Sequence, residues 1–337
     1  MAGDDEPVGG VGSDGSGWVR AGRLVDAGIA AVLALGAFVM ASRLLGWMIH
    51  PLVVLAQSAL PVTMIPVWLA LPVAAARRLP VRAVVALVLC VSHAFALAPA
   101  MGSRRLPVWA APGTAAATLR LVSANVFEAN HDPGLGGALL AARPDVLVLV
   151  EVNDTILEEL DASGLFAGFA HVARSGNANS VVIASKLPLD DVKPGIVGGV
   201  AVVSARVAVG GKGVRVIAAH PRAPSGPARM AQFRVWMRWA RDQARVTSGP
   251  LVMAGDFNAS RFVPVMGALL AGGFTDAHES RGSGLSTSWP AGGPFFDLPF
   301  MRLDHVLMRG AVVARSVRDL TVPGSDHLGI VAVLAVR

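Results

Sequence analysis

The sequence Gly-Pro-Leu-Val-Met-Ala-Gly-Asp-Phe-Asn, residues Gly249–Asn258, joins a short apolar run to a carboxylate and a carboxamide. Alternate residues of an extended strand point to the same side, so we expect Asp256 and Asn258 to face one ligand while Phe257 packs the other way. A hard metal ion or a phosphoryl group suits such a pair of oxygen-bearing side chains. Taken alone, the stretch fits equally well a strand that ends in an Asx turn before a helix.

Hydropathy divides the 337-residue chain into an apolar first third and a more polar remainder. Residues 1–20 are rich in Gly, Ser, Asp and Glu, which predicts a disordered N-terminus. Within residues 21–102 lie three apolar stretches, each close to the ~20 residues that cross a bilayer: Leu24–Ser42, Leu52–Leu71 and Ala83–Met101. A cleavable signal peptide has a shorter apolar region and would not precede two further spans, so we predict three transmembrane helices.

Basic residues beside the predicted spans indicate their orientation. Five arginines lie on the side of the N-terminus and three on the other, namely Arg20, Arg23, Arg77, Arg78 and Arg82 against Arg43, Arg104 and Arg105. The N-terminus is therefore predicted inside, and everything after Met101 outside the cytoplasm. Pro61, Pro66 and His93 are interior to the spans and are tolerable where they face neighbouring helices.

The remainder of the chain is predicted to be one soluble domain. Residues 103–117 are rich in Pro, Ala and Gly and predict a linker, whereas residues 118–337 are long enough to bury a full core as one unit. Predicted strands in this domain end on polar groups, at Glu151, at His220 and at Asp256. In open α/β layers that edge of the sheet is where ligands bind.

Six motifs occur in a fixed order along this domain: Ser-Ala-Asn-Val with Asn125, an apolar run ending at Glu151, Ala-Ala-His-Pro with His220, Gly-Asp-Phe-Asn at Gly255–Asn258, Leu-Asp-His-Val at Leu303–Val306 and Ser-Asp-His at Ser325–His327. Together they resemble the endonuclease/exonuclease/phosphatase superfamily, the relatives of DNase I. The resemblance implies that the soluble domain is a four-layer α/β sandwich, so the whole chain is predicted to be an α/β protein in which the three transmembrane helices precede that sandwich. It also implies metal-dependent hydrolysis of phosphate esters.

The resemblance implies a metal-binding set. Glu151 is the expected main ligand, with Asn125 and Asp326 close by. Oxygen ligation of this kind suits Mg²⁺ or Mn²⁺ better than Zn²⁺. Asn179 matches a family position loosely and is expected to contact the phosphate of the substrate.

The resemblance also implies catalytic roles. His327 is the expected general base or phosphate-polarising imidazole, and Asp304 would hold its ring in the correct tautomer. Asp256 would orient the attacking water, and Asn258 would hydrogen-bond the phosphoryl oxygens. His220 would protonate the leaving oxygen or stabilise the charge of the pentacovalent state. The next residue after Asp304, His305, points the other way on an alternating strand and is expected to pack in the core.

Features that grip nucleic acid are scarce in this chain. It has no tyrosine, and from Leu106 onward 21 Lys and Arg nearly balance 18 Asp and Glu. The clustered positive charge lies on the predicted helix Ala228–Arg245, where Arg234, Arg238, Arg241 and Arg245 share one face. That face is either a solvated helix surface or a contact with anionic headgroups. The loop Trp289–Phe300 either dips into the membrane interface or covers the core.

Three spans joined to this domain resemble actinobacterial membrane proteins of the VanJ type, which are associated with resistance to teicoplanin-like glycopeptides. The resemblance implies a membrane-anchored phosphohydrolase or phosphodiesterase that acts on a lipid-linked phosphate or pyrophosphate of the cell envelope. No protein partner is evident. Two alternatives stay open, a membrane-tethered nuclease that acts on extracellular DNA and a non-catalytic binding domain, although the intact motifs argue against the latter.

Overall fold

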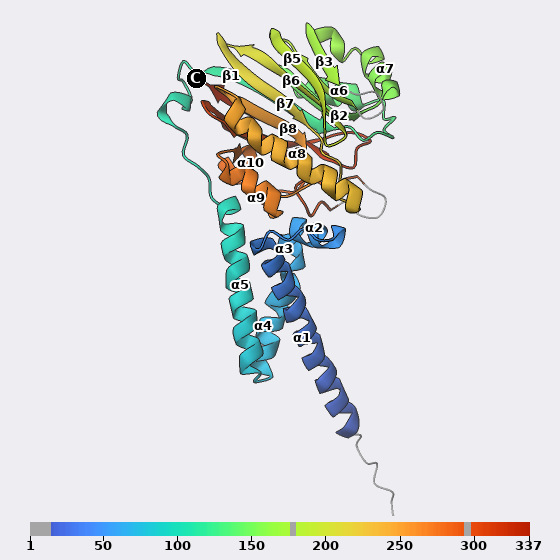
Figure 1. The fold of residues 1–337 in the computed structure, drawn as a ribbon, viewed down its shortest axis with the longest axis vertical. Coiled ribbons are helices and arrows are strands. Elements are labelled where there is room, and N and C mark those ends of the chain that lie inside the picture. Colours follow the sequence, from blue (N-terminus) through green and yellow to red (C-terminus); the bar gives the residue numbers. More distant parts are fainter. Residues whose placement is uncertain (1–14, 176–179, 293–297) are drawn as a thin grey trace, which may run out of the picture.

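The computed structural model describes residues 15–175, 180–292 and 298–337 (Figure 1). Two sheets packed face to face, with helices on both outer faces, form the larger part of these residues. The expected four-layer α/β sandwich is therefore confirmed. The predicted disordered N-terminus falls mainly on residues 1–14, outside the described residues, and the chain from Gly15 onward is helical.

Each sheet has six strands among the described residues. The first sheet has the order β11-β12-β1-β2-β4-β3, with β1 (Ala117–Asn125), β2 (Val146–Val152), β3 (His171–Ser175), β4 (Ser180–Ser185), β11 (Val312–Thr321) and β12 (Leu328–Val336). The second has the order β5-β6-β7-β8-β10-β9, with β5 (Leu189–Val197), β6 (Val200–Val209), β7 (Lys212–Ala219), β8 (Leu251–Asp256), β9 (Thr275–Asp276) and β10 (Asp304–Arg309). In each sheet one parallel pair, β1 with β2 and β7 with β8, lies among antiparallel neighbours.

Apolar side chains from both sheets meet in the central layer and are mostly Val, Ile, Leu and Ala. The outer helices are α6 (Leu135–Ala141), α7 (Asp154–Ala162), α8 (Pro227–Val246) and α9 (Pro264–Ala271). Helices α6 and α7 pack on the first sheet, and α8 and α9 pack on the second. Because both faces of the central strands are covered, they carry continuous apolar runs that end abruptly at polar residues.

The polar strand ends meet at one edge of the sandwich. Strands β1 and β8 end at Asn125 and Asp256, while the antiparallel strands β10 and β12 begin at Asp304 and directly after His327. Asp304 is the register partner of Asp256. Gly255 has φ 140°, and a Cβ there would lie 2.1 Å from the Ala219 carbonyl oxygen, so only glycine fits beside β7.

The N-terminal helices extend away from the sandwich (Figure 1). Two of them, over Trp18–Leu44 in α1 (Gly15–Leu44) and Pro80–Met101 in α5 (Pro80–Met101), are long and apolar enough to cross a membrane. The middle predicted span differs from expectation, because it consists of α2 (Pro51–Ser58), α3 (Leu60–Thr63) and α4 (Ile65–Ala76), with a bend of 87° after α2.

Proline explains this break. Each of the three short helices has a proline in its first turn, at Pro51, Pro61 and Pro66. Proline lacks the backbone N–H of a helix interior and is favoured at a helix start, so it divides the segment. Pro61 and Pro66 were expected inside one helix and instead begin new ones. As a result α2 lies across the end of the helical region, directly beneath the sandwich (Figure 1).

Several contacts join the helical region to the sandwich. Arg234 of α8 donates to the carbonyl of Met48, and Met48 and Val54 pack into the apolar layer beneath α8. The Arg234 side chain thus contacts the N-terminal region of its own chain. The expected linker, residues 103–117, also lies against the domain, since Arg104 N donates to Ser280 O and Arg315 donates to Ala110 O.

Candidate active site

The centre of the polar edge is a cluster of one amide and two carboxylates. Asn125 Nδ2 donates to Glu151 Oε1 at 2.8 Å and to Asp256 Oδ2 at 3.2 Å. The amide is held in turn, because Phe127 N donates to Asn125 Oδ1 at 3.0 Å. Asn125 and Asp256 are buried, and Glu151 is partly open. The structure therefore brings together predicted residues from three strands.

His220 closes one side of this cluster. Its Nε2 lies 3.2 Å from Glu151 Oε1 and 3.8 Å from Asp256 Oδ2. The residue follows β7 directly, and the parallel pairing of β7 with β8 carries it to the end of β8. Its ring therefore faces both carboxylates.

A second imidazole, His327, stands opposite. Its Nδ1 lies 2.8 Å from Asp304 Oδ2, and its Nε2 lies 3.9 Å from both Asp256 Oδ2 and Asp326 Oδ1. A carboxylate only accepts hydrogen bonds, so the Nδ1 atom carries a proton and Nε2 faces the cluster. Asp304 thus lies in contact with the ring it is expected to orient, and that orienting role stays a prediction.

Two residues that the sequence analysis did not assign to the site form hydrogen bonds with the residues around His327. Trp289 Nε1 donates to Asp326 Oδ2 at 3.0 Å. Ser325 Oγ donates to the carbonyl of Asn125 at 2.8 Å and accepts from His327 N at 3.0 Å, so it ties β1 to the turn before β12. The serine stood inside a recognised motif, whereas no local pattern marked the tryptophan as a partner of Asp326.

The backbone at two site residues is unusual. Glu151 has φ 59° and Asn258 has φ 49°, in the left-handed region that non-glycine residues seldom adopt. Asn258 N donates to Asp256 Oδ1 at 2.7 Å, and Asn258 Nδ2 donates to the carbonyl of Pro221 at 3.0 Å. Such conformations cost of order 1–3 kcal/mol and concentrate at functional sites.

Charges in the cluster shift one another's pKa values. Burial alone would raise the pKa of Glu151, but the hydrogen bond and charge of His220 lower it to about 2. Burial raises the pKa of Asp256 to about 6, with a further contribution from Asp304. Burial acts to lower the pKa of His327, but Asp304 and Asp256 outweigh it and raise the pKa to about 10. Burial also acts to lower the pKa of His220, but the hydrogen bond to Glu151 and the nearby negative charges outweigh burial, so this pKa is raised.

The donor set fits a divalent cation. Two groups of side chains offer ligand atoms within 4.8 Å of one another among the described residues, namely Glu151, His220 and Asp256, and Asp256, Asp304 and His327. Buried carboxylates at such spacing repel one another unless a cation or a proton compensates them. Asp326 belongs to neither group, and its expected role as a ligand stays a prediction, as do those of Glu151 and Asn125.

The cluster opens into a cavity of about 430 Å³. One wall carries Glu151, Asp256 and His327, and the opposite wall is α2, with Leu52 and Leu55. These two leucines are 66% and 47% exposed, so their side chains lack a protein partner over much of their surface. The sequence analysis placed α2 within a continuous membrane span. The prolines at 51, 61 and 66 were the signal that this span would break into shorter helices.

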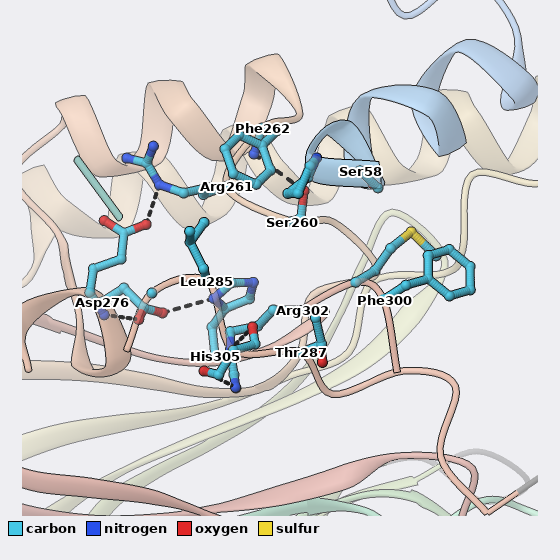
Figure 2. A pocket seen from close by; sticks show the side chains of 15 residues that line it. Ser58, Ser260, Arg261, Phe262, Asp276, Leu285, Thr287, Phe300, Arg302 and His305 are labelled. Atoms are coloured by element: carbon cyan, nitrogen blue, oxygen red, sulfur yellow. Dashed lines mark hydrogen bonds and ion pairs between the residues drawn. The ribbon is translucent and has the colours of Figure 1, made fainter. Parts of the chain in front are cut away.

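Two further predicted positions complete the comparison. His305 points away from the cluster, as expected, and its Nδ1 lies 2.8 Å from Asp276 Oδ2 (Figure 2). Its Nε2 lies 3.0 Å from the Ala259 carbonyl oxygen. It is buried beside Phe257 and has a packing position. Asn179, the expected phosphate contact, lies outside the described residues.

Comparison with known proteins gives a match over most of the sandwich. The sequence profile described as "Endonuclease/Exonuclease/phosphatase family" matches residues 122–327. No curated protein matches the sequence at a significant level.

Solved structures share the fold of the sandwich. A protein named endonuclease/exonuclease/phosphatase from Beutenbergia cavernae is 21% identical, with 65% of this chain and 72% of that chain covered and a TM-score of 0.51. Humanized TDP2 from D. rerio is 18% identical over 64% and 98%, with a TM-score of 0.54. The 3' phosphatase NExo from Neisseria, solved with a product DNA hairpin, is 24% identical over 64% and 98%, with a TM-score of 0.50.

Proposed function

This chain belongs to the endonuclease/exonuclease/phosphatase family of metal-dependent phosphoric ester hydrolases, and from that premise we propose that it is membrane-anchored and hydrolyses a lipid-linked phosphate or pyrophosphate. One observation carries the proposal. The ionic cluster around Glu151 and His327 and the apolar side chains of α2 line the same cavity. A substrate with a phosphate head and a hydrocarbon tail complements both walls.

The cavity is poorly suited to a nucleic-acid backbone. Among its described lining residues there is no Lys or Arg, whereas nucleic-acid binding draws most of its affinity from such contacts to phosphates. Apolar surface, in contrast, gains about 25 cal/mol for each Å² removed from water. Leu52 and Leu55 would gain this from an acyl or isoprenyl chain. The nuclease is therefore the second candidate, supported by neighbours such as D. rerio TDP2, solved with a single-strand DNA product.

In the proposed reaction, water attacks phosphorus and passes a proton to Asp256, while the bond from phosphorus to the leaving oxygen breaks. The leaving group is the lipid alcohol for a monophosphate and the lipid phosphate for a pyrophosphate. Glu151, Asn125 and Asp326 would hold Mg²⁺ or Mn²⁺, which supplies Lewis-acid polarisation of a phosphoryl oxygen when bound. Asp256 accepts a hydrogen bond from the attacking water and orients it.

The two imidazoles stabilise charge on the phosphoryl group. The Nε2 atom of His327, oriented by Asp304, contacts a phosphoryl oxygen, and His220 donates to the leaving oxygen. Asn258 also belongs to the proposed phosphoryl contacts. Its Nδ2 hydrogen bond to Pro221 must open or be shared for that contact.

The proposal includes an extracytoplasmic catalytic domain and the role in glycopeptide resistance that the VanJ-type resemblance implies. Its deciding assay compares four substrates with full-length protein in micelles: undecaprenyl pyrophosphate, lipid II, a sphingomyelin-type phosphodiester and plasmid DNA. We expect Mg²⁺-dependent hydrolysis of at least one lipid, followed by mass spectrometry of its products, and none after addition of EDTA, with His327→Ala as the inactive control. Efficient nicking of plasmid without hydrolysis of any lipid would replace this proposal with the tethered nuclease.

A further inference from the structure

A second cavity, of about 550 Å³, lies where the helical region meets the underside of the sandwich. Its walls come from the ends of the two candidate spans, α1 and α5, and from α9, with Arg43 and Arg261 among the lining residues. The N-terminal helices contribute to this cavity and to the cavity of the candidate active site, but the two cavities have no lining residue in common. We call it the arginine groove.

Of the two arginines in the groove, Arg261 has an acidic partner and Arg43 has none among the described residues. Arg261 forms an ion pair with Glu279 (Figure 2). It also donates to the carbonyl of Ala96. Arg43 takes part in none of the ion pairs of the described residues, and its buried Nε has no hydrogen-bond partner among them. The described lining residues include no Asp or Glu. A buried guanidinium donor without a partner costs free energy, so an anion is the natural occupant.

The rest of the groove is apolar and faces outward. Phe95 of α5 and Leu44 of α1 are 75% and 72% exposed, and Leu270 and Ala271 of α9 contribute the opposite wall. Arg43 lies in the last turn of α1, and Pro99 lies near the end of α5, so the arginines stand at the level where both spans leave the membrane. Cations at this level meet phosphate headgroups, while Phe95 and Leu44 meet acyl chains.

We propose that the arginine groove is a binding site for one anionic phospholipid, whose phosphate lies between Arg43 and Arg261 and whose acyl chains lie along α1 and α5. Arg guanidinium groups bind phosphate oxygens through paired N–H donors, which suits the orphaned Nε of Arg43. The proposal rests on the membrane location given in the proposed function. Arg261 follows the catalytic Asn258 by only three residues, so a bound lipid also braces the loop that leaves β8.

The test is lipid retention by full-length protein, measured by native mass spectrometry after incubation with equal amounts of phosphatidylglycerol and phosphatidylcholine in detergent. Wild type should retain one phosphatidylglycerol in preference to phosphatidylcholine. Because one basic residue near an anionic surface contributes ~1 kcal/mol, Arg43→Gln should reduce this preference about five-fold or more. Arg43→Lys should keep most of it. Arg318→Gln, the same change on exposed β11, should behave as wild type.

Equal retention of both lipids by wild type would overturn the proposal without any variant, and so would an unchanged preference in Arg43→Gln. Excess inorganic phosphate should leave the lipid bound, because a free ion lacks the contacts of the acyl chains. Complete displacement by phosphate would overturn the assignment to a lipid. The readout does not involve turnover, so failure of the proposed hydrolase activity would not be mistaken for failure of this site.

Discussion

His327 Nδ1 lies 2.8 Å from Asp304 Oδ2, and this pair joins the start of β10 in one sheet to the residue before β12 in the other. Both side chains are almost fully buried. The contact fixes the ring of His327 so that Nε2 faces Asp256 and Asp326. The two sheets of the sandwich are thus linked at the point where the proposed chemistry occurs.

The pair should act as one catalytic unit. On bis-p-nitrophenyl phosphate, His327→Ala and Asp304→Asn should each lower kcat by ~10²–10⁴-fold, since one removes the imidazole and the other its orientation. The double variant should be little worse than the more severe single variant. If the fold-losses in kcat of the two single variants multiplied in the double variant, the two residues would act independently and a shared role would be wrong.

Glu151 should control metal affinity. Glu151→Gln keeps the side-chain shape but removes the charge. We expect the Mg²⁺ concentration for half-maximal activity to rise at least about 10–100-fold, because loss of a residue that only hydrogen-bonds a metal ligand already weakens metal binding by that factor. Glu158→Gln, on the exposed face of α7, is the matched control. Turnover of wild type that survives EDTA would show that the metal-dependent mechanism is wrong.

The α2 wall should select lipid substrates. Leu52→Ser removes an apolar side chain from the cavity, so kcat/KM for a lipid phosphate should fall about 10-fold, which corresponds to the ~1.5 kcal/mol from burial of one leucine. Hydrolysis of bis-p-nitrophenyl phosphate should stay within about two-fold of wild type, because the small substrate does not need the wall. Ile196→Ser on β5, which removes another largely exposed apolar side chain outside the cavity, should change neither activity. Equal losses on both substrates would count against a lipid-selective wall.

The Asp276–His305 pair should make stability depend on acid. Burial acts to raise the pKa of Asp276, but the hydrogen bond and charge of His305 hold that pKa well below its ordinary range. The carboxylate therefore contributes stability that is fully present above pH ~4 and is lost as pH falls from there toward the folded-state pKa. Asp276→Asn keeps a side-chain oxygen that can accept the hydrogen bond from Glu279 N, but it removes the negative charge of the carboxylate.

At neutral pH the Asp276→Asn variant should lose about 3 kcal/mol of stability, because it breaks a buried ion pair on one side. In thermal unfolding of full-length protein, its Tm deficit against wild type should shrink below pH ~4. Asp161→Asn, an exposed carboxylate, should show no deficit at either pH. A Tm deficit that stays constant with pH would contradict the charge-based account.

The C-terminus should lie outside the cytoplasm. Alkaline phosphatase fused after Arg337 should be active, because that reporter requires export, and a green fluorescent protein fused at the same site should stay dark. The five arginines beside the inner span ends give the physical reason. Bright fluorescence together with inactive phosphatase would place the domain and its substrate at the inner leaflet.

Local pattern by itself predicted where the buried strands end on polar residues, whereas the four-layer sandwich was implied by the resemblance of the six ordered motifs to the superfamily. A strand buried on both faces is a continuous apolar run, so the polar residue that ends it, such as Glu151 or Asp256, is visible without coordinates. The alternation of a strand likewise predicted that Asp304 and His305 face opposite ways. Two apolar helices, α1 and α5, followed from length and hydropathy alone.

Only the tertiary structure decided which distant groups meet. The pairing of Asp304 with His327, the Trp289 contact to Asp326 and the left-handed backbone of Glu151 depend on how two sheets stack, and no sequence spacing encodes that stacking. The position of α2 is also a tertiary result, because proline predicts where a helix breaks but not where the next piece packs. The apolar wall of the cavity exists because the chain bends by 87° after α2, so that α2 lies beside the candidate active site.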